Sequence, residues 1–239
     1  MPSIENPLTK KLATVIEFTE VEQNQLSNLQ ERAIKIAKGE VLLQEGLSED
    51  KMYIVQSGWT SMYKDLPNGE RQIINFALPG DCVGLRSIFL KKSDHSFEAL
   101  TAAQISSVGA GQLLRLFDDH PRIRDAFLWS AAREESMIVQ RLTSLGRRSA
   151  IERIAYFFLE LLERLTLVGL AGNAEFKCPL SQSTLADALG LTAIHVNRIM
   201  RQLQERKLMT ARYGKVVIHD PNELGILAGY HAEHGPPLY

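Results

Sequence analysis

Over residues 32–117, apolar and polar positions alternate in short runs. Turn-forming residues such as Gly, Pro, Asn and Asp separate these runs at even intervals. Such runs occupy residues 52–55, 60–64, 72–78 and 103–108. Short strands at even spacing are typical of a roll or barrel, so we predict an all-β fold for this part of the chain.

From Pro121 to about Leu145, the chain keeps a helical pattern that no Gly or further Pro interrupts. One stripe recurs along it at spacings of three and four: Ile123, Phe127, Ser130, Glu134, Met137, Arg141 and Leu145. We predict a long helix over residues 121–145 that buries this stripe against the same helix of a second subunit. Packing on the chain's own β-roll is the alternative, and the two arrangements are compatible.

Two further helices are marked by their N-terminal caps. Thr19 and Ser149 each begin the Ser/Thr-x-x-Glu pattern of a capping box. The first predicts a short helix that ends near Gln30, and the second predicts an amphipathic helix over residues 151–166. Because Gly146, Arg147 and Arg148 interrupt the long helical pattern just before the second cap, we expect a hinge near Gly146.

Residues 180–207 have the pattern of a helix-turn-helix. Ser181 and Thr192 are the expected N-caps of its two helices, and Gly190 is suited to the turn between them. The outward face of the second helix carries Asn and Arg, which can form paired hydrogen bonds with base edges in the major groove. The DNA-contacting residues that we expect here are Ser181, Ser183, Thr192, Ala193, Ile194, His195, Asn197, Arg198 and Arg201. An ordinary helical hairpin with a solvated polar face is the alternative.

The segment after this motif, residues 209–220, predicts two short strands joined by a turn at Tyr213–Gly214–Lys215. A hairpin at this position is a wing, and its residues Arg212 and Lys215 are placed to contact phosphates. Residues 176–218 carry seven Lys and Arg against two acids, a net charge of +5. The whole chain carries −1, so the remainder carries −6. This concentration of basic charge is typical of a nucleic-acid-binding segment, although a solvated basic helix would share it.

Composition limits the class of protein. The chain has 239 residues, and its apolar fraction of 45% is enough for one large or two modest cores. No apolar stretch approaches the roughly 18 residues of a transmembrane helix, and no signal-peptide pattern begins the chain, so we expect a cytoplasmic protein without a membrane partner. Cys82 and Cys178 are too far apart in sequence for a metal-ligand pattern. The sequence has no catalytic-triad or Walker pattern, and we expect no enzymatic activity.

Four motifs together resemble the cyclic-AMP receptor and fumarate–nitrate reduction regulator family (CRP/FNR). They are KGEVLLQEG at 38–46, MYIVQSG at 52–58, PGDCVG at 79–84 and LADALGLTAIHVNRIMRQL at 185–203. The resemblance implies an α+β chain with a cyclic-nucleotide-binding-like β-roll (1–120), a dimerisation helix (121–145) and a winged helix-turn-helix domain (146–239). It also implies a bacterial, homodimeric transcription regulator that binds a palindromic promoter operator in double-stranded DNA and contacts RNA polymerase.

The effector pocket implied by the resemblance comprises Gly80, Gly84, Leu85, Arg86, Ser87, His95 and Ser96. In the cyclic-AMP receptors, a Glu for the ribose and an Arg for the cyclic phosphate stand where this chain has Leu85 and His95. The phosphate would lose its bidentate guanidinium partner, so we expect no control by cyclic AMP. Arg86 is adjacent but would approach from a different position.

The same residues bear on other effectors of the β-rich part and on other classes of protein. An iron–sulfur cluster needs about four thiolates, and residues 1–40 contain no cysteine. A haem ligated by His95 stays open, as does an unidentified small-molecule effector, so the cofactor is unknown. A cupin-like metalloenzyme would need several convergent ligands, but the β-rich part has His95 alone among histidines. A cyclic-nucleotide module serving an attached enzyme or channel would lack the winged helix-turn-helix.

The predicted recognition helix departs from the family at the base-reading positions. Many relatives have a Glu where this chain has Ile194, which offers only apolar contact, for example to a thymine methyl group. Asn197 replaces a common Ser or Gly, whereas Arg198 keeps the family's arginine. His195 lies beside this face and is better placed for a phosphate. We therefore expect an operator that differs from the familiar family consensus sequences.

Overall fold

The computed structural model describes residues 6–231. These residues divide into two compact units. The first holds residues 6–64 and 75–135, and the second holds residues 65–74 and 136–231. Within the described part of the chain, no helix is long and apolar enough to cross a membrane.

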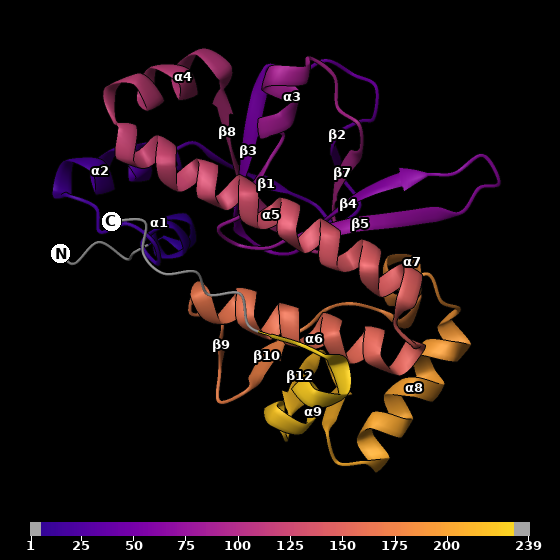
Figure 1. The fold of residues 1–239 in the computed structure, drawn as a ribbon. Coiled ribbons are helices and arrows are strands. Elements are labelled where there is room, and N and C mark those ends of the chain that lie inside the picture. The colour runs from indigo at the N-terminus through magenta and orange to yellow at the C-terminus, as the bar shows by residue number, and fades with distance from the viewer. Residues whose placement is uncertain (1–5, 232–239) are drawn as a thin grey trace. The chain divides into compact units, whose positions relative to one another are not determined.

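Antiparallel strands build the β-rich part of the chain (Figure 1). They are β1 (Ala33–Ile36), β2 (Val41–Leu43), β3 (Lys51–Ser57), β4 (Thr60–Asp65), β5 (Arg71–Ala77), β6 (Cys82–Val83), β7 (Ser96–Ala99) and β8 (Ala103–Gly109). One sheet has the order β1-β8-β3-β6 and the other the order β2-β7-β4-β5. The predicted β-roll is therefore confirmed.

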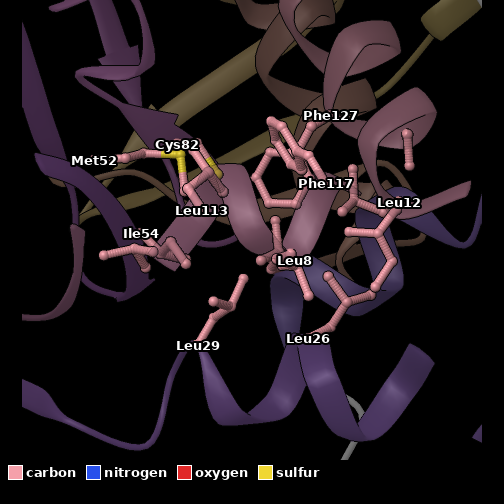
Figure 2. Packing of buried hydrophobic residues seen from close by; sticks show 14 of the residues in the cluster. Leu8, Leu12, Leu26, Leu29, Met52, Ile54, Cys82, Leu113, Phe117 and Phe127 are labelled. Carbon is pink, nitrogen blue, oxygen red and sulfur yellow. The ribbon is translucent and has the colours of Figure 1, made fainter. Parts of the chain in front are cut away.

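Short helices accompany the strands of the first unit. They are α1 (Pro7–Leu12), α2 (Glu20–Asn28), α3 (Leu85–Leu90) and α4 (Ala110–Asp119). Figure 2 shows the apolar cluster that they share with the sheet, in which Leu8 and Leu26 are almost fully buried. The rings of Phe117 and Phe127 pack with their centroids 5.3 Å apart. Thr19 and Glu22 form the predicted capping box.

A buried ion pair attaches α1 to the loop before β6. Lys11 Nζ lies 2.7 Å from Asp81 Oδ1, and the two side chains are only 5% and 9% exposed. Asp81 Oδ2 also accepts a hydrogen bond from the backbone N–H of Leu78. The carboxylate thus holds both the N-terminal helix and the turn that precedes β6.

The long helix α5 (Pro121–Arg147) is continuous through Gly146. The chain leaves the helix at Arg148 and Ser149, at the end of the predicted break, and Ser149 caps α6 (Ala150–Leu167) through the predicted capping box with Glu152. Glycine is tolerated in the last turn of a helix, so its presence alone did not end α5.

The stripe predicted to form the dimer seam lies inside its own subunit. Ile123, Phe127, Ser130, Met137 and Arg141 are buried, and Glu134 and Leu145 are half-buried. Ile123 and Phe127 belong to the cluster of Figure 2. The burial of most of these side chains supports the alternative of packing on the same chain. Because Glu134 and Leu145 keep part of their surface exposed, the dimer-seam assignment of this stripe stays a prediction.

The second unit contains the predicted winged motif. Its helices after α6 are α7 (Gln182–Leu189), α8 (Ala193–Glu205) and α9 (Pro221–Ala228). Its strands are β9 (Ala171–Gly172), β10 (Glu175–Lys177), β11 (Met209–Arg212) and β12 (Lys215–Ile218). They form one antiparallel sheet in the order β11-β12-β10-β9, so two strands precede the helix-turn-helix and two follow it.

Candidate nucleic-acid interface

Local hydrogen bonds set the two helices of the motif. Ser181 Oγ accepts a hydrogen bond from Thr184 N at 3.1 Å and caps α7. Gly190 ends α7 with a φ of 62°, a left-handed conformation that costs glycine little. Thr192 Oγ1 then accepts from His195 N at 3.2 Å and caps α8. The predicted caps and turn are confirmed.

The helix α8 separates its apolar and polar residues onto opposite faces. Val196, Ile199 and Leu203 are at most 5% exposed and pack inward. The other side is presented to solvent, with Ile194, Asn197, Arg198 and Arg201 exposed. Spacings of three and four place these four residues on one face, which can offer hydrogen-bond donors and an apolar surface to base edges.

The remaining predicted contact residues surround this face to different degrees. Ser183 is exposed near the start of α7, where its Oγ lies 2.7 Å from the capping Ser181 Oγ. Ala193 and His195 are half-buried in the first turn of α8. The hydroxyls and backbone N–H groups at these helix N-termini are suited to phosphate oxygens.

One residue that sequence reasoning missed fixes this motif to the end of α5. Arg153, in the first turns of α6, donates hydrogen bonds to the carbonyl oxygens of Ser144, Leu145 and Arg148 at 3.1–3.2 Å. Its Nη1 also donates to the carbonyl oxygen of Leu189, the last residue of α7, at 2.6 Å. No sequence pattern distinguished this arginine from the other basic residues of the amphipathic helix.

The wing is a two-residue hairpin joined to the rest of its sheet through β10. Arg212 pairs with Lys215 across the turn, and both are exposed. Lys215 Nζ also forms a 2.8 Å ion pair with Glu175 Oε2. The predicted phosphate contact of Lys215 therefore competes with an ion pair in the same chain. Because both side chains are about half exposed, the ion pair contributes little to the stability of the fold. Lys215 can therefore exchange Glu175 for a phosphate.

The predicted effector residues lie along the segment from the end of β5 to β7. Gly80 and Gly84 adopt φ values of 91° and 90°. A Cβ added to Gly84 would lie 2.9 Å from the carbonyl oxygen of Lys51, so the turn requires glycine. Leu85 is half-buried against the cluster of Figure 2. Ser87 is buried, and Ser96 Oγ accepts from Glu45 N at 3.1 Å.

His95 and Arg86 are connected through a residue that the sequence analysis did not select. Asp94 Oδ1 lies 2.8 Å from His95 Nδ1, and Asp94 Oδ2 lies 2.6 Å from Arg86 Nη2. Burial alone would raise the pKa of Asp94, but the hydrogen bond with His95 and the charge of Arg86 bring it below its usual value. His95 is 8% exposed, and its buried Nε2 has no hydrogen-bond partner among the described residues. The guanidinium of Arg86 is thus paired with Asp94 at the surface, whereas His95 keeps one buried ring nitrogen for another group.

A second apolar stripe on α5 was also missed. Its apolar side chains remain exposed to solvent: Leu128 at 57%, Ile138 at 39%, Val139 at 56% and Leu142 at 71%. The exposed residues Leu128, Ala132, Glu135, Val139 and Leu142 recur at alternating spacings of four and three, and Ile138 lies beside this row. This is the heptad spacing of a coiled-coil seam, and it is the signal that could have found the stripe.

Neither cysteine has the properties of a reactive thiolate. Burial raises the pKa of Cys82 to about 12 and that of Cys178 to about 11. Among residues 6–231, no group of three or more His, Cys, Asp or Glu side chains is arranged to hold a metal ion.

Both units match known protein families. Residues 33–120 match the cyclic nucleotide-binding domain, and residues 152–225 match the Crp-like helix-turn-helix domain. The nitrogen fixation regulation protein FixK of Bradyrhizobium diazoefficiens is 31% identical over 82% of this chain and 82% of its own length. The transcriptional activator protein Anr of Pseudomonas protegens is 30% identical over 85% of this chain and 83% of its own.

Among solved structures, FixK2 from Bradyrhizobium japonicum superposes with a TM-score of 0.74 at 28% identity, covering 84% of this chain and 98% of that one. That structure shares the fold found here, with a β-rich domain, a long helix and a C-terminal helix-turn-helix. Because both domains match and the relatives are similar over most of their length, the chain belongs to the CRP/FNR family of DNA-binding transcription regulators.

Proposed function

We propose that this regulator acts as a homodimer on a palindromic operator. The two subunits meet along the exposed stripe of α5, and each α8 enters one major groove. The heptad spacing of Leu128, Val139 and Leu142 supports this seam, because apolar side chains at that spacing pack well only against a second helix. Two-fold symmetry of the protein then requires two-fold symmetry of the operator.

The observation that carries the function is the outward face of α8. Arg198 has a guanidinium suited to guanine O6 and N7, and Asn197 has an amide suited to adenine or to a bridging phosphate. Ile194, 83% exposed, is placed for a thymine methyl group. The residues at the helix N-termini and in the wing hold phosphates and fix the register without reading sequence.

Selection of operators from a randomised duplex library tests this proposal. The wild-type protein should enrich a palindrome, and Arg198→Ala should bind it about 10- to 100-fold more weakly and lose preference at one base pair per half-site. Lys215→Ala is the control, because a phosphate contact weakens all sequences alike and lowers the salt slope by about one per subunit. A uniform loss in Arg198→Ala, with unchanged sequence preference, would contradict this reading face.

We further propose that the β-roll responds to a signal other than cyclic AMP. Leu85 packs into the apolar cluster, and Asp94 engages the guanidinium of Arg86, so the cyclic phosphate finds no arginine at the position of His95. Calorimetric titration with cyclic AMP at millimolar concentration should show no saturable binding. Micromolar binding would overturn this part of the proposal. His95 Nε2 stays available to a hydrogen-bond donor or, as a second candidate, to haem iron.

The proposed DNA-bound dimer also has a role at the promoter. We propose that the DNA-bound dimer contacts RNA polymerase in the cytoplasm and carries out no catalysis of its own. Relatives named transcriptional activator protein support the contact with polymerase. Transcription in vitro from a selected operator, with purified polymerase and increasing regulator, measures it directly. Unchanged transcript levels at full operator occupancy would exclude the contact at that promoter.

A further inference from the structure

The tip of the wing has an unusual conformation for its sequence. Tyr213 and Gly214 are the two residues between β11 and β12, and both have positive φ, 52° and 72°. Two-residue hairpin turns with positive φ at both positions favour Asn, Asp or Gly at the first of them, because a larger side chain is strained there. This chain has a tyrosine at that position.

The strained turn is held by the backbone around it. Cys178 N donates to the carbonyl oxygen of Gly214 at 2.8 Å. On either side, β12 pairs with β11 from Arg212↔Lys215 onward and with β10 from Lys177↔Lys215 onward. These contacts fix the loop between two paired strands, and such over-determination is what allows a strained residue to persist.

The ring of Tyr213 contributes almost nothing to the fold. Its side chain is fully exposed, at 104% of the reference area. A large aromatic side chain that is strained in its backbone and unburied gives the folded chain no packing energy in return. Strain kept without a structural gain points to a contact with another molecule.

The charges around the ring indicate which molecule. Arg212 precedes Tyr213, Lys215 follows Gly214, and both side chains are exposed. The turn belongs to the segment 176–218, whose net charge of +5 contrasts with the acidic remainder of the chain. An aromatic ring between two cations suits a sugar–phosphate backbone, where the cations hold phosphates and the ring covers the apolar face of a deoxyribose.

We propose that Tyr213 is a DNA-contacting residue that binds the sugar–phosphate backbone at the flank of each half-site, outside the bases reached by α8. Arg212 and Lys215 hold the adjacent phosphates, and Lys215 exchanges its ion pair with Glu175 for one of them. The inference rests on the proposed DNA complex. It adds a contact with the flanking backbone to the base contacts of α8.

Tyr213→Asn separates this role from a structural one, because the two roles predict opposite signs. Asparagine tolerates the left-handed conformation, so the variant should melt at a higher temperature than the wild type. Its affinity for a selected operator with long flanks should nevertheless fall about five- to twentyfold, the size expected from loss of one aromatic contact. On a duplex trimmed to the bases under α8, the wild type and Tyr213→Asn should bind equally.

Two controls complete the experiment. Tyr213→Phe keeps the ring and should bind the long operator within about threefold of the wild type. Lys91→Asn relieves a comparable left-handed residue, φ 63°, at the end of α3 in the other unit. It should raise the melting temperature and leave operator affinity unchanged.

The outcomes that would overturn the inference are distinct from failure of the proposed function. If Arg198→Ala loses binding but Tyr213→Asn does not, the α8 interface stands and the wing-tip contact is wrong. An equal loss on long and trimmed duplexes would also contradict a flanking contact. A transcription defect without any loss of operator affinity would assign Tyr213 to a protein partner instead.

Discussion

Arg153 Nη1 donates a hydrogen bond to the carbonyl oxygen of Leu189 at 2.6 Å, while the same guanidinium holds carbonyl oxygens at the end of α5. One side chain therefore links the end of the long helix with the turn of the DNA-binding motif. Helix C-termini leave carbonyl groups without intrahelical partners, and a guanidinium with five donors can satisfy several of them at once.

Removal of this link should weaken folding and DNA binding together. In Arg153→Ala the carbonyl oxygens of two helix ends lose a charged donor, which we expect to cost about 2–4 kcal/mol in the free energy of unfolding. Urea denaturation followed by circular dichroism measures the loss. Arg153→Lys, with one ammonium in place of the guanidinium, should recover only part of it. An unchanged urea midpoint in Arg153→Ala would show that these hydrogen bonds contribute nothing to the free energy of unfolding.

The exposed stripe of α5 gives a test of assembly. In Leu142→Glu, a charge would enter the proposed seam, and dimerisation should weaken by about two orders of magnitude because a buried unpaired charge costs several kcal/mol. Analytical ultracentrifugation should show a folded monomer with poor operator binding. Val21→Glu, at another exposed apolar position, is the control and should stay dimeric. A dimeric Leu142→Glu would exclude this face of α5 from the interface.

A substitution on the opposite side of α5 should behave differently. Phe127 is 1% exposed and packs on Phe117 inside the subunit (Figure 2). Phe127→Glu should therefore destabilise the fold itself, by about 3–5 kcal/mol or more. Thermal unfolding distinguishes the two substitutions: Leu142→Glu should melt as a folded protein, whereas Phe127→Glu should lose its cooperative transition or melt far lower.

In the buried Lys11–Asp81 pair, removal of one charge should destabilise the protein more than removal of both charges. Lys11→Met leaves a buried carboxylate without its cation, which we expect to cost about 3–5 kcal/mol. The double variant Lys11→Met, Asp81→Asn removes both charges and should be more stable than Lys11→Met alone. Chemical denaturation of the two variants gives the comparison. Equal stabilities would mean that the charge of Asp81 is compensated by other means.

The buried thiols predict a loss of stability at high pH. Their pKa values are raised in the folded protein, to about 12 for Cys82 and about 11 for Cys178. Below about pH 9 both states keep the thiols protonated, and above it only the unfolded state releases protons, so stability falls as pH rises. Each thiol contributes a slope of at most about 1.4 kcal/mol per pH unit. The variant Cys82→Ala with Cys178→Ala should show a shallower decline between pH 9 and 11.

Local signals predicted much of this molecule because their physical causes are local. The caps at Thr19, Ser149, Ser181 and Thr192 depend on a side chain and a backbone N–H three residues away. The turn at Gly190 likewise depends on one residue's freedom of φ. These elements and the spacing of the strands are therefore sufficient to predict the order of the β-rich and helix-turn-helix parts and the outward face of α8.

The features that the sequence patterns could not decide are contacts between distant parts of the chain. Two stripes of α5 have heptad-like spacing, one through Phe127 and Met137 and one through Val139 and Leu142. Spacing alone cannot tell which of these stripes the rest of the folded chain will cover. Likewise, Asp94 is adjacent to His95 in sequence, but its simultaneous contact with Arg86 depends on how α3 ends. Arg153 could not be singled out because its acceptors come from two other helices.

The dimer proposed along the exposed stripe of α5 would also set how promoter occupancy depends on the amount of this regulator in a cell. An apolar seam shared by two copies makes the concentration of DNA-binding species rise with the square of the subunit concentration, as long as most subunits are single. Halving the gene dosage then lowers operator occupancy by up to fourfold. With Leu142 in the proposed seam, promoter occupancy would rise more steeply than linearly with protein abundance, separately from any signal that the β-roll receives.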